Sequence, residues 1–174
     1  MLVTLTRPIL CAVAACAVMV CPLKAGATGQ MPDYLVIDGQ THGLTHARPF
    51  EPILRSDRPG AGALRDQLQA ARGNCSALWR GYHGTWEVRD GALYLTRLTV
   101  GPCGMGPDVK AAVFPYAAGS VKATWVTGRL VFNVGTTQPY AHLLAETLMQ
   151  SIDVVEGEVV GPPTMFVPPP SFRH

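Results

Sequence analysis

Apolar and polar residues alternate over short runs in residues 33–161, and glycine or proline interrupts these runs at short intervals. This pattern is typical of short antiparallel strands joined by tight turns. The sequence therefore predicts a mainly β protein, an antiparallel meander of short hairpins that forms a curled sheet, a small barrel or a sandwich. The segment DYLVIDG (33–39) is predicted to be the first strand, ending at a turn.

The clearest hairpin lies in WRGYHGTWEVRDGALYL (79–95), where Asp90-Gly91 is a strong two-residue turn signal. A turn at these residues places apolar side chains on one face of the hairpin and polar side chains on the other, as expected for a sheet with one buried face. The predicted pairs are Trp86–Leu95 and Val88–Leu93 on the inner face, and Thr85–Thr96 and Glu87–Tyr94 on the outer face.

A second hairpin is predicted in SVKATWVTGRLVFNVG (120–135), with its turn at Thr127-Gly128. Thr-Gly is a weaker turn signal than Asp-Gly. The pairs expected from this turn are Trp125–Leu130, Ala123–Phe132 and Val121–Val134.

One short helix is predicted near residues 62–72, because GALRDQLQAARG combines good helix formers with apolar residues at helical spacing and a glycine stop. The proline-rich segment 47–62 before it is expected to cross the surface in extended form. In residues 138–161, AHLLAETLMQ favours a helix by propensity, whereas SIDVV, EGE and VVG indicate a strand, a tight turn and a terminal strand; periodicity does not separate these alternatives.

The two ends of the chain differ from its middle. Residues 1–27 are predicted to be a signal peptide, because a single Arg7 precedes an apolar run that is followed by small residues ending at Ala27. A lipoprotein lipidated at Cys16 is the alternative. Residues 28–161 are expected to form one β-rich domain, and the proline-rich segment 162–174 to be a disordered tail.

Cysteine and charge point to an exported protein that binds neither nucleic acid nor a membrane surface. Outside the predicted signal peptide only Cys75 and Cys103 remain, and an even pair in an exported chain predicts a disulfide. The full chain carries 14 Lys+Arg and 12 Asp+Glu; cleavage at Ala27 removes Arg7 and Lys24, which leaves a neutral chain. A neutral chain without basic clusters argues against nucleic-acid binding and against a polybasic membrane patch. The mature chain is expected to have no transmembrane span.

Three short motifs carry a resemblance to a known family. Trp79-Arg80-Gly81-Tyr82, Thr85-Trp86-Glu87 and Leu93-Tyr94-Leu95 together resemble the recurring Trp-Arg-Gly-Tyr, Thr-Trp-Glu and Leu-Tyr-Leu pattern of small uncharacterised bacterial proteins. The resemblance covers residues 33–161 except an insertion around 57–73. It implies that residues 140–155 form a strand rather than a helix, and it implies no established activity.

Five candidate binding residues lie in the same motif, Arg80, Tyr82, His83, Glu87 and Tyr94, and His142 is a sixth. Glu87 with a histidine is the best candidate pair for a hydrolase, and Arg80 is expected near Glu87. His42 and His46 have the spacing of a metal pair, but no further ligand motif supports a metal site. No cofactor motif, nucleophile elbow or phosphate loop is present in the sequence.

These features favour a non-enzymatic module of the bacterial cell envelope, periplasmic or secreted, that binds another protein or an envelope component. Two alternatives remain open: a small periplasmic hydrolase that uses Glu87 and a histidine, and a β-barrel that carries a ligand in its interior. The oligomeric state is left open.

Overall fold

The computed structural model describes residues 29–45, 47–71, 75–117, 119–134 and 148–166. The predicted signal peptide, His46 and His142 lie outside the described residues. In chain order the elements are β1 (Tyr34–Ile37), β2 (Gln40–Thr45), α1 (Glu51–Leu54), α2 (Ala61–Ala71), η1 (Ser76–Leu78), β3 (Tyr82–Arg89), β4 (Ala92–Val100), η2 (Pro102–Gly104), α3 (Lys110–Val113), β5 (Val121–Lys122), β6 (Gly128–Asn133), β7 (Met149–Val155) and β8 (Glu158–Phe166).

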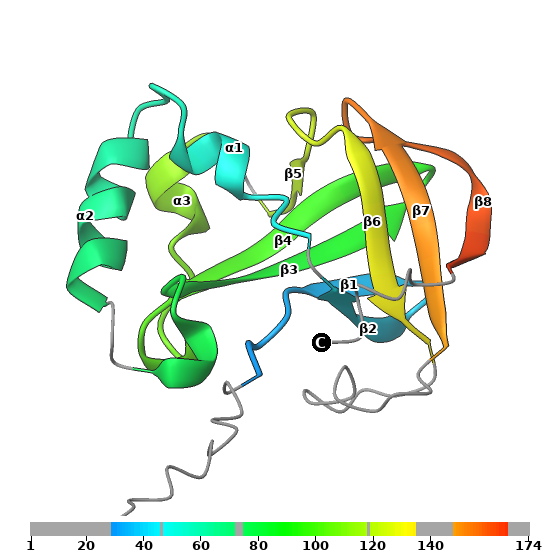
Figure 1. Cartoon of the computed structure of the whole chain (residues 1–174). Coiled ribbons are helices and arrows are strands. Elements are labelled where there is room, and N and C mark those ends of the chain that lie inside the picture. Colours follow the sequence, from blue (N-terminus) through cyan, green and yellow to red (C-terminus); the bar gives the residue numbers. More distant parts are fainter. Residues whose placement is uncertain (1–28, 46, 72–74, 118, 135–147, 167–174) are drawn as a thin grey trace, which may run out of the picture.

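Seven strands close into a small barrel, which confirms the predicted fold class. The strand order is β3-β1-β2-β6-β7-β8-β4, and pairing of β3 with β4 completes the ring. Strand β5 adds to β4 outside this ring. Figure 1 shows the long β3–β4 pair running out of the barrel toward α1, α2 and α3, which pack beside it. All pairings are antiparallel except β1 with β3, so the ring is not a simple meander.

Three hairpin turns share one backbone geometry. At Asp38-Gly39, Asp90-Gly91 and Glu156-Gly157, both central residues have positive φ, between 49° and 81°. This is the type I′ turn, whose twist matches the twist of paired strands. The turns join β1 to β2, β3 to β4 and β7 to β8. The turn that ends the first strand and the Asp90-Gly91 hairpin are as the sequence predicts. Of the two alternatives left open for residues 138–161, the strand, tight turn and terminal strand are found from Met149 onward.

The register of the β3–β4 hairpin is the predicted one close to the turn and differs beyond it. Trp86 faces Leu95, Val88 faces Leu93 and Glu87 faces Tyr94, but Thr85 faces Arg97 rather than Thr96. Thr96 is the extra residue of a β-bulge, and its hydroxyl donates a hydrogen bond to the carbonyl of Thr85 at 3.0 Å.

The second predicted hairpin is wrong. Strand β5 pairs with β4, whereas β6 lies between β2 and β7. The chain between β5 and β6 turns locally, since the Val126 amide donates to the Ala123 carbonyl at 2.9 Å, and the Gly157 amide then donates to the Val126 carbonyl at 2.9 Å. These contacts tie the segment to the β7–β8 turn and direct its two ends to different neighbours.

The helix predicted at 62–72 is confirmed as α2, whose Leu64 and Leu68 are buried. The extended form predicted for residues 47–62 is wrong in part, because Glu51–Leu54 forms the short helix α1. Pro52 does not interrupt it, since the first turn of a helix does not need that amide. Ile53 buries its side chain in the common core.

Strand β8 overturns the predicted disordered tail over residues 162–166. The register between β7 and β8 shifts after Val160, so Ser151 faces Thr164 while Asp153 faces Val160. Pro162 and Pro163 fall in this irregular stretch. Proline has no backbone N–H to donate, and the irregular pairing of β7 with β8 does not call for one at these positions. Residues 167–174 of the predicted tail lie outside the described part of the chain.

One hydrophobic cluster joins the barrel interior to the helices. Leu35, Trp86, Leu93 and Leu95 are each fully buried on the inner face of the barrel. Among the described residues, no helix has the length and apolar character needed to cross a membrane.

A groove beside the disulfide as the candidate functional site

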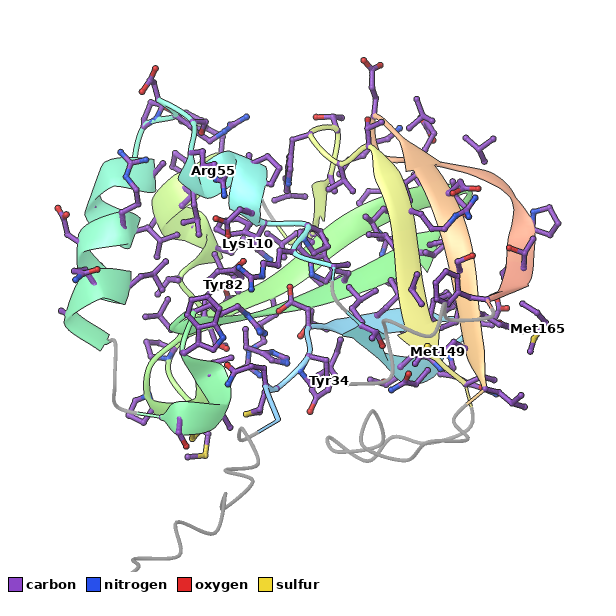
Figure 2. The ribbon with its side chains drawn as sticks, in the orientation of Figure 1. Tyr34, Arg55, Tyr82, Lys110, Met149 and Met165 are labelled. Atoms are coloured by element: carbon purple, nitrogen blue, oxygen red, sulfur yellow. A yellow bond between two sulfur atoms is a disulfide. The ribbon has the colours of Figure 1, made fainter. Side chains whose placement is uncertain are left out.

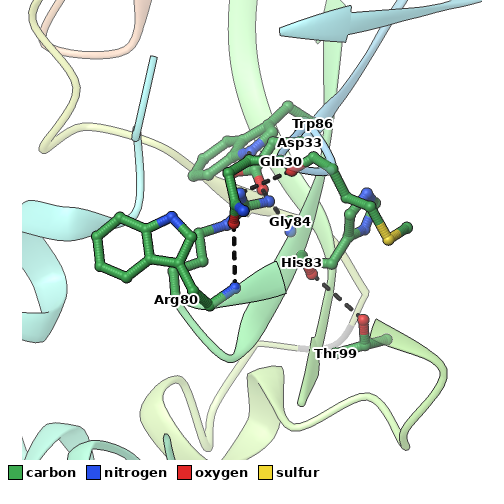
Figure 3. Close-up of polar contacts among 9 residues, drawn as sticks. Gln30, Asp33, Arg80, His83, Gly84, Trp86 and Thr99 are labelled. Carbon is green, nitrogen blue, oxygen red and sulfur yellow. Dashed lines mark hydrogen bonds and ion pairs between the residues drawn. The ribbon is translucent and has the colours of Figure 1, made fainter. Parts of the chain in front are cut away.

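A buried carboxylate organises the segment that carries most of the candidate residues. The Asp33 side chain, 2% exposed, lies just before β1 and forms an ion pair with Arg80 at 2.8 Å. It also accepts hydrogen bonds from the Gly84 amide at 3.0 Å and from Nε1 of Trp86 at 3.1 Å (Figure 3). Arg80 donates further to the Met31 carbonyl at 2.7 Å. Arg80 therefore holds the N-terminal segment against β3, and the expected contact of Arg80 with Glu87 is not formed.

The network leaves no room for a side chain at position 84, which is a glycine. A Cβ atom added there would lie 2.8 Å from Nε1 of Trp86 and 2.9 Å from Oδ2 of Asp33. The close approach explains why a glycine interrupts an aromatic-rich strand. Most of the conspicuous motif is thus accounted for by one buried hydrogen-bond network.

Tyr82 belongs to the core rather than to a surface site. Its side chain extends from β3 into the layer between the strands and the helices (Figure 2). Its ring meets the ring of Phe50 edge-on, with 5.6 Å between the ring centroids. Burial raises the pKa of the Tyr82 hydroxyl well above its usual range, and the nearby Asp33 adds to the shift. A neutral, inaccessible phenol is not suited to recognise a partner.

The candidate site is a groove on the outer face of β1, β3 and β4, with a volume of about 270 Å³. Residues from the N-terminal segment, three strands and the disulfide-bonded loop line it. These residues are Met31, Tyr34, His83, Thr85, Arg97, Thr99, Cys103, Gly104 and Met105.

His83 is, like Thr99, a buried polar residue of the groove lining. It is 8% exposed, its ring lies edge-on to Tyr34 at 4.5 Å, and its Nε2 atom has no hydrogen-bond partner within the described ranges. Burial lowers the pKa of His83 because it penalises the imidazolium; Asp33 opposes this effect, while Arg80 and Arg97 reinforce it. The ring is therefore biased toward its neutral form, and its Nε2 atom is buried without a hydrogen-bond partner in the described ranges.

The disulfide predicted from the sequence forms between Cys75 and Cys103. It fastens the η2 loop next to His83, so closely that a Cβ atom on Gly104 would lie 2.9 Å from the Cβ atom of His83. Gly104 also has φ of +72°, which favours glycine. The bridge thus shapes one wall of the groove.

Arg97 is the site residue that the sequence analysis missed. Regular alternation from the Asp90-Gly91 turn would place it on the inner face of the hairpin, opposite Gly84. The bulge at Thr96 shifts the register by one residue, so that Arg97 faces Thr85 on the outer side. Its guanidinium makes no hydrogen bond or ion pair to the part of the chain that the structure describes.

Glu87 and Tyr94, two further candidates that the structure describes, are not gathered around His83. Glu87 lies four residues further along β3, about 13 Å at the usual strand rise, and contacts Arg89 at 3.3 Å. Arg89 also covers the ring of Tyr94 at 4.6 Å. The side chains of Glu87 and Tyr94 both lie on the outer face, but neither lines the groove.

The histidine pair considered for a metal is not assembled. His42 is buried, and its Nδ1 atom is 2.9 Å from the Asn133 carbonyl oxygen; His46 and His142 cannot be placed, since they lie outside the described residues. Across the described ranges, no three His, Cys, Asp or Glu side chains come close enough to hold a metal ion together.

Comparison with known proteins adds no further constraint. No protein-family model, curated protein or solved structure gives a significant match to this chain. The family resemblance carried by the Trp-Arg-Gly-Tyr motif stays a prediction, and function must be argued from the groove itself.

Proposed function

We propose that this protein is an exported, non-enzymatic binding module of the bacterial cell envelope, and that the groove around His83 is its binding site. The observation that carries the proposal is the Nε2 atom of His83, buried in a concave wall and unpaired within the described ranges. Buried polar atoms are normally hydrogen-bonded, so an unpaired one in a residue that lines a groove favours a ligand there.

The disulfide supports the location. Bridges of this kind persist in the periplasm and outside the cell but are rare in a reducing cytosol. The bridge also holds one wall of the groove in place, as a preformed binding site requires. Export through the predicted signal peptide at residues 1–27 is part of the proposal.

The geometry gives less support to the two alternatives. A hydrolase that uses Glu87 with His83 needs both groups within hydrogen-bond reach of one substrate, whereas they are separated by four residues of extended strand. A ligand-carrying barrel needs interior space, whereas fully buried Trp86, Leu93 and Leu95 occupy the interior.

Site-specific crosslinking in the exporting cell tests the proposal. A photoreactive amino acid replaces Met105, which lines the groove and is 82% exposed. The matched control replaces Tyr116, which is fully exposed and lies outside the groove. Irradiation is expected to give an adduct of defined mass, resolved by mass spectrometry of the purified chain, at position 105 and not at 116. No adduct at 105, or equal adducts at both positions, contradicts the proposal.

A further inference from the structure

The η2 loop depends on the disulfide for its position beside the groove. The hydrogen bonds of residues 101–105 stay within the loop, where the amides of Gly104 and Met105 each donate to the carbonyl three residues earlier at 3.1 Å. In the described part of the chain, no hydrogen bond or ion pair joins these residues to η1 or to β3. The bridge between Cys75 and Cys103 is therefore the bond that fastens the loop to η1.

The segments on either side of the bridge are held in place by other contacts. Where the loop returns to β4, the Val109 amide donates to the Leu98 carbonyl at 2.7 Å, and the Leu98 amide donates to a carboxylate oxygen of Asp108 at 3.2 Å. In η1, the Ala77 carbonyl accepts a hydrogen bond from the Met31 amide at 2.6 Å. Opening of the bridge is thus expected to free the middle of the loop and to leave η1 and β4 where they are.

The bridge holds Cys103 in an unfavourable backbone conformation. The φ angle of Cys103 is +50°, in the left-handed region that Gly, Asn and Asp adopt more readily than other residues. Gly101 and Gly104, on either side of it, also have positive φ, and they allow the loop to change its backbone conformation. Backbone strain in a bridged residue is relieved when the bridge opens, and strained bridges are the more easily reduced ones.

The bridge lies near the surface rather than in the core. Cys75 and Cys103 are each half-buried, and Cys103 is part of the groove lining. This position favours exchange with an external thiol, in contrast to a bridge enclosed among apolar side chains.

The loop covers one side of His83. A Cβ atom added to Gly104 would lie 2.9 Å from the Cβ atom of His83. In the bridged protein His83 is 8% exposed, and its Nε2 atom is buried. Release of the loop is therefore expected to remove one wall of the groove and to expose His83 to solvent.

We propose that the Cys75–Cys103 disulfide is a redox switch for the groove, in which reduction by a dithiol protein releases the η2 loop and dismantles one groove wall while the barrel stays folded. A donor thiolate attacks Sγ of Cys103, which forms a mixed disulfide and releases Cys75 as a thiolate. The second donor thiol then attacks the donor sulfur of the mixed disulfide and releases Cys103. The donor loses two electrons and becomes a disulfide, and its two thiol protons end on the two cysteines. The inference rests on the proposed binding function and gives that function its regulation.

The first measurement tests whether the folded protein exchanges thiols. The purified, bridged chain is mixed with dithiothreitol at increasing concentrations, and free thiols are counted by alkylation and mass spectrometry. We expect the reduction rate to rise in proportion to the dithiothreitol concentration, because the bridge is attacked in the folded protein. A rate that instead reaches a plateau at the rate of global unfolding in the same buffer overturns the inference, since the bridge is then reached only by unfolding.

The second measurement tests release of the loop through the reaction of histidine rings with diethyl pyrocarbonate, followed by peptide mass spectrometry. Cys75→Ser with Cys103→Ser stands for the reduced chain and lacks the two thiols that would compete for the reagent. We expect His83 to react about tenfold faster or more in this double variant than in the bridged chain. His42 is the matched control within the same molecule, because it is equally buried, at 7% exposed, and lies on β2 outside the groove. Its reaction rate is expected to stay the same.

Two results of this measurement overturn the inference. Equal rates at His83 in the bridged chain and the double variant would show that the loop keeps its place without the bridge. A comparable rise at His42 would show that the bridge supports the whole fold rather than the loop.

The photoreactive residue at position 105 separates the switch from the binding function. If both hold, the adduct seen in the native chain falls several-fold in the double variant, because the groove has lost a wall. A comparable adduct in both proteins overturns the switch and leaves the binding function standing. Absence of the adduct in both proteins, together with a faster reaction of His83 in the double variant, refutes the binding function and supports redox control of the groove.

Discussion

At the scale of single residues, Asp33 does more than any other polar side chain to hold the site together. Its carboxylate accepts hydrogen bonds from the Arg80 side chain, the Gly84 amide and the Trp86 side chain, which all lie within residues 80–86. A buried charge needs both an opposite charge and hydrogen bonds to be tolerated. The cluster supplies both, and so it fixes the start of β3 and the N-terminal segment that borders the groove.

Asp33→Ala should therefore destabilise the protein by about 3 kcal/mol, since it leaves the largely buried Arg80 charge without its partner. Urea unfolding followed by tryptophan fluorescence measures the change. Asp153→Ala is the matched control, because the Asp153–Arg129 pair is about half exposed on each side. The control should leave the unfolding midpoint almost unchanged. Equal losses in the two variants would contradict the role given to Asp33.

His83 should make stability depend on pH in the range where histidines titrate. Its pKa is lowered in the folded state, so below the ordinary histidine value of about 6.5 the unfolded chain binds a proton that the folded chain resists. The unfolding free energy should thus fall as pH drops below that value, by no more than about 1.4 kcal/mol per pH unit.

The measurement compares urea unfolding of the native chain and of His83→Phe at several pH values between 7.5 and 5. The variant should lose less stability over this interval, whatever its absolute stability, because it has no imidazole to protonate. Parallel curves for the two proteins would show that His83 does not titrate as its buried setting requires.

At the scale of elements, the disulfide-bonded loop and the bulge in β4 decide the shape of the groove. The loop brings Gly104 against His83, and the bulge turns Arg97 to the outer face. The loop lies outside the barrel ring, whereas the bulge lies within the β3–β4 pair that closes it. The groove therefore combines a surface loop with a rigid β scaffold, as is common for sites on such folds.

Removing the bridge by Cys75→Ser with Cys103→Ser should cost about 3–4 kcal/mol, because the bridge closes a 28-residue separation in the unfolded chain. Urea unfolding of the oxidised chain, the double variant and the native chain in reductant measures this. The reduced native chain should match the double variant. A double variant as stable as the oxidised chain would contradict the prediction.

At the scale of the whole molecule, ring closure separates the interior from the candidate site. The inner face of β3 and β4 carries fully buried apolar side chains, whereas His83 and Thr85 lie on the outer face of β3. Binding at the groove is therefore expected without opening the barrel. This placement is the reason that a surface-binding role is favoured over an interior carrier.

Local patterns were sufficient to predict much of this arrangement. Asp90-Gly91 and the alternation around it determine a hairpin with Trp86 and Leu95 inside, because a two-residue turn sets the register next to it. The disulfide and α2 also follow from local signals. Of the candidate residues that the structure describes, only His83 was both predicted from the sequence and found in the groove.

The rest depended on contacts between distant segments. Pairing of β1 with β3, separation of β5 from β6 and inclusion of Pro162 in β8 are choices among strand neighbours, and periodicity carries no information about neighbours. Arg97 reaches the groove through a bulge that regular alternation cannot anticipate, and Asp33 gains its role from partners about fifty residues away. The sequence by itself determined the β3–β4 hairpin, α2 and the bridge, since these follow from local sterics and spacing. Only the tertiary structure decided the other strand neighbours and which outer-face residues meet, because that requires the closed ring.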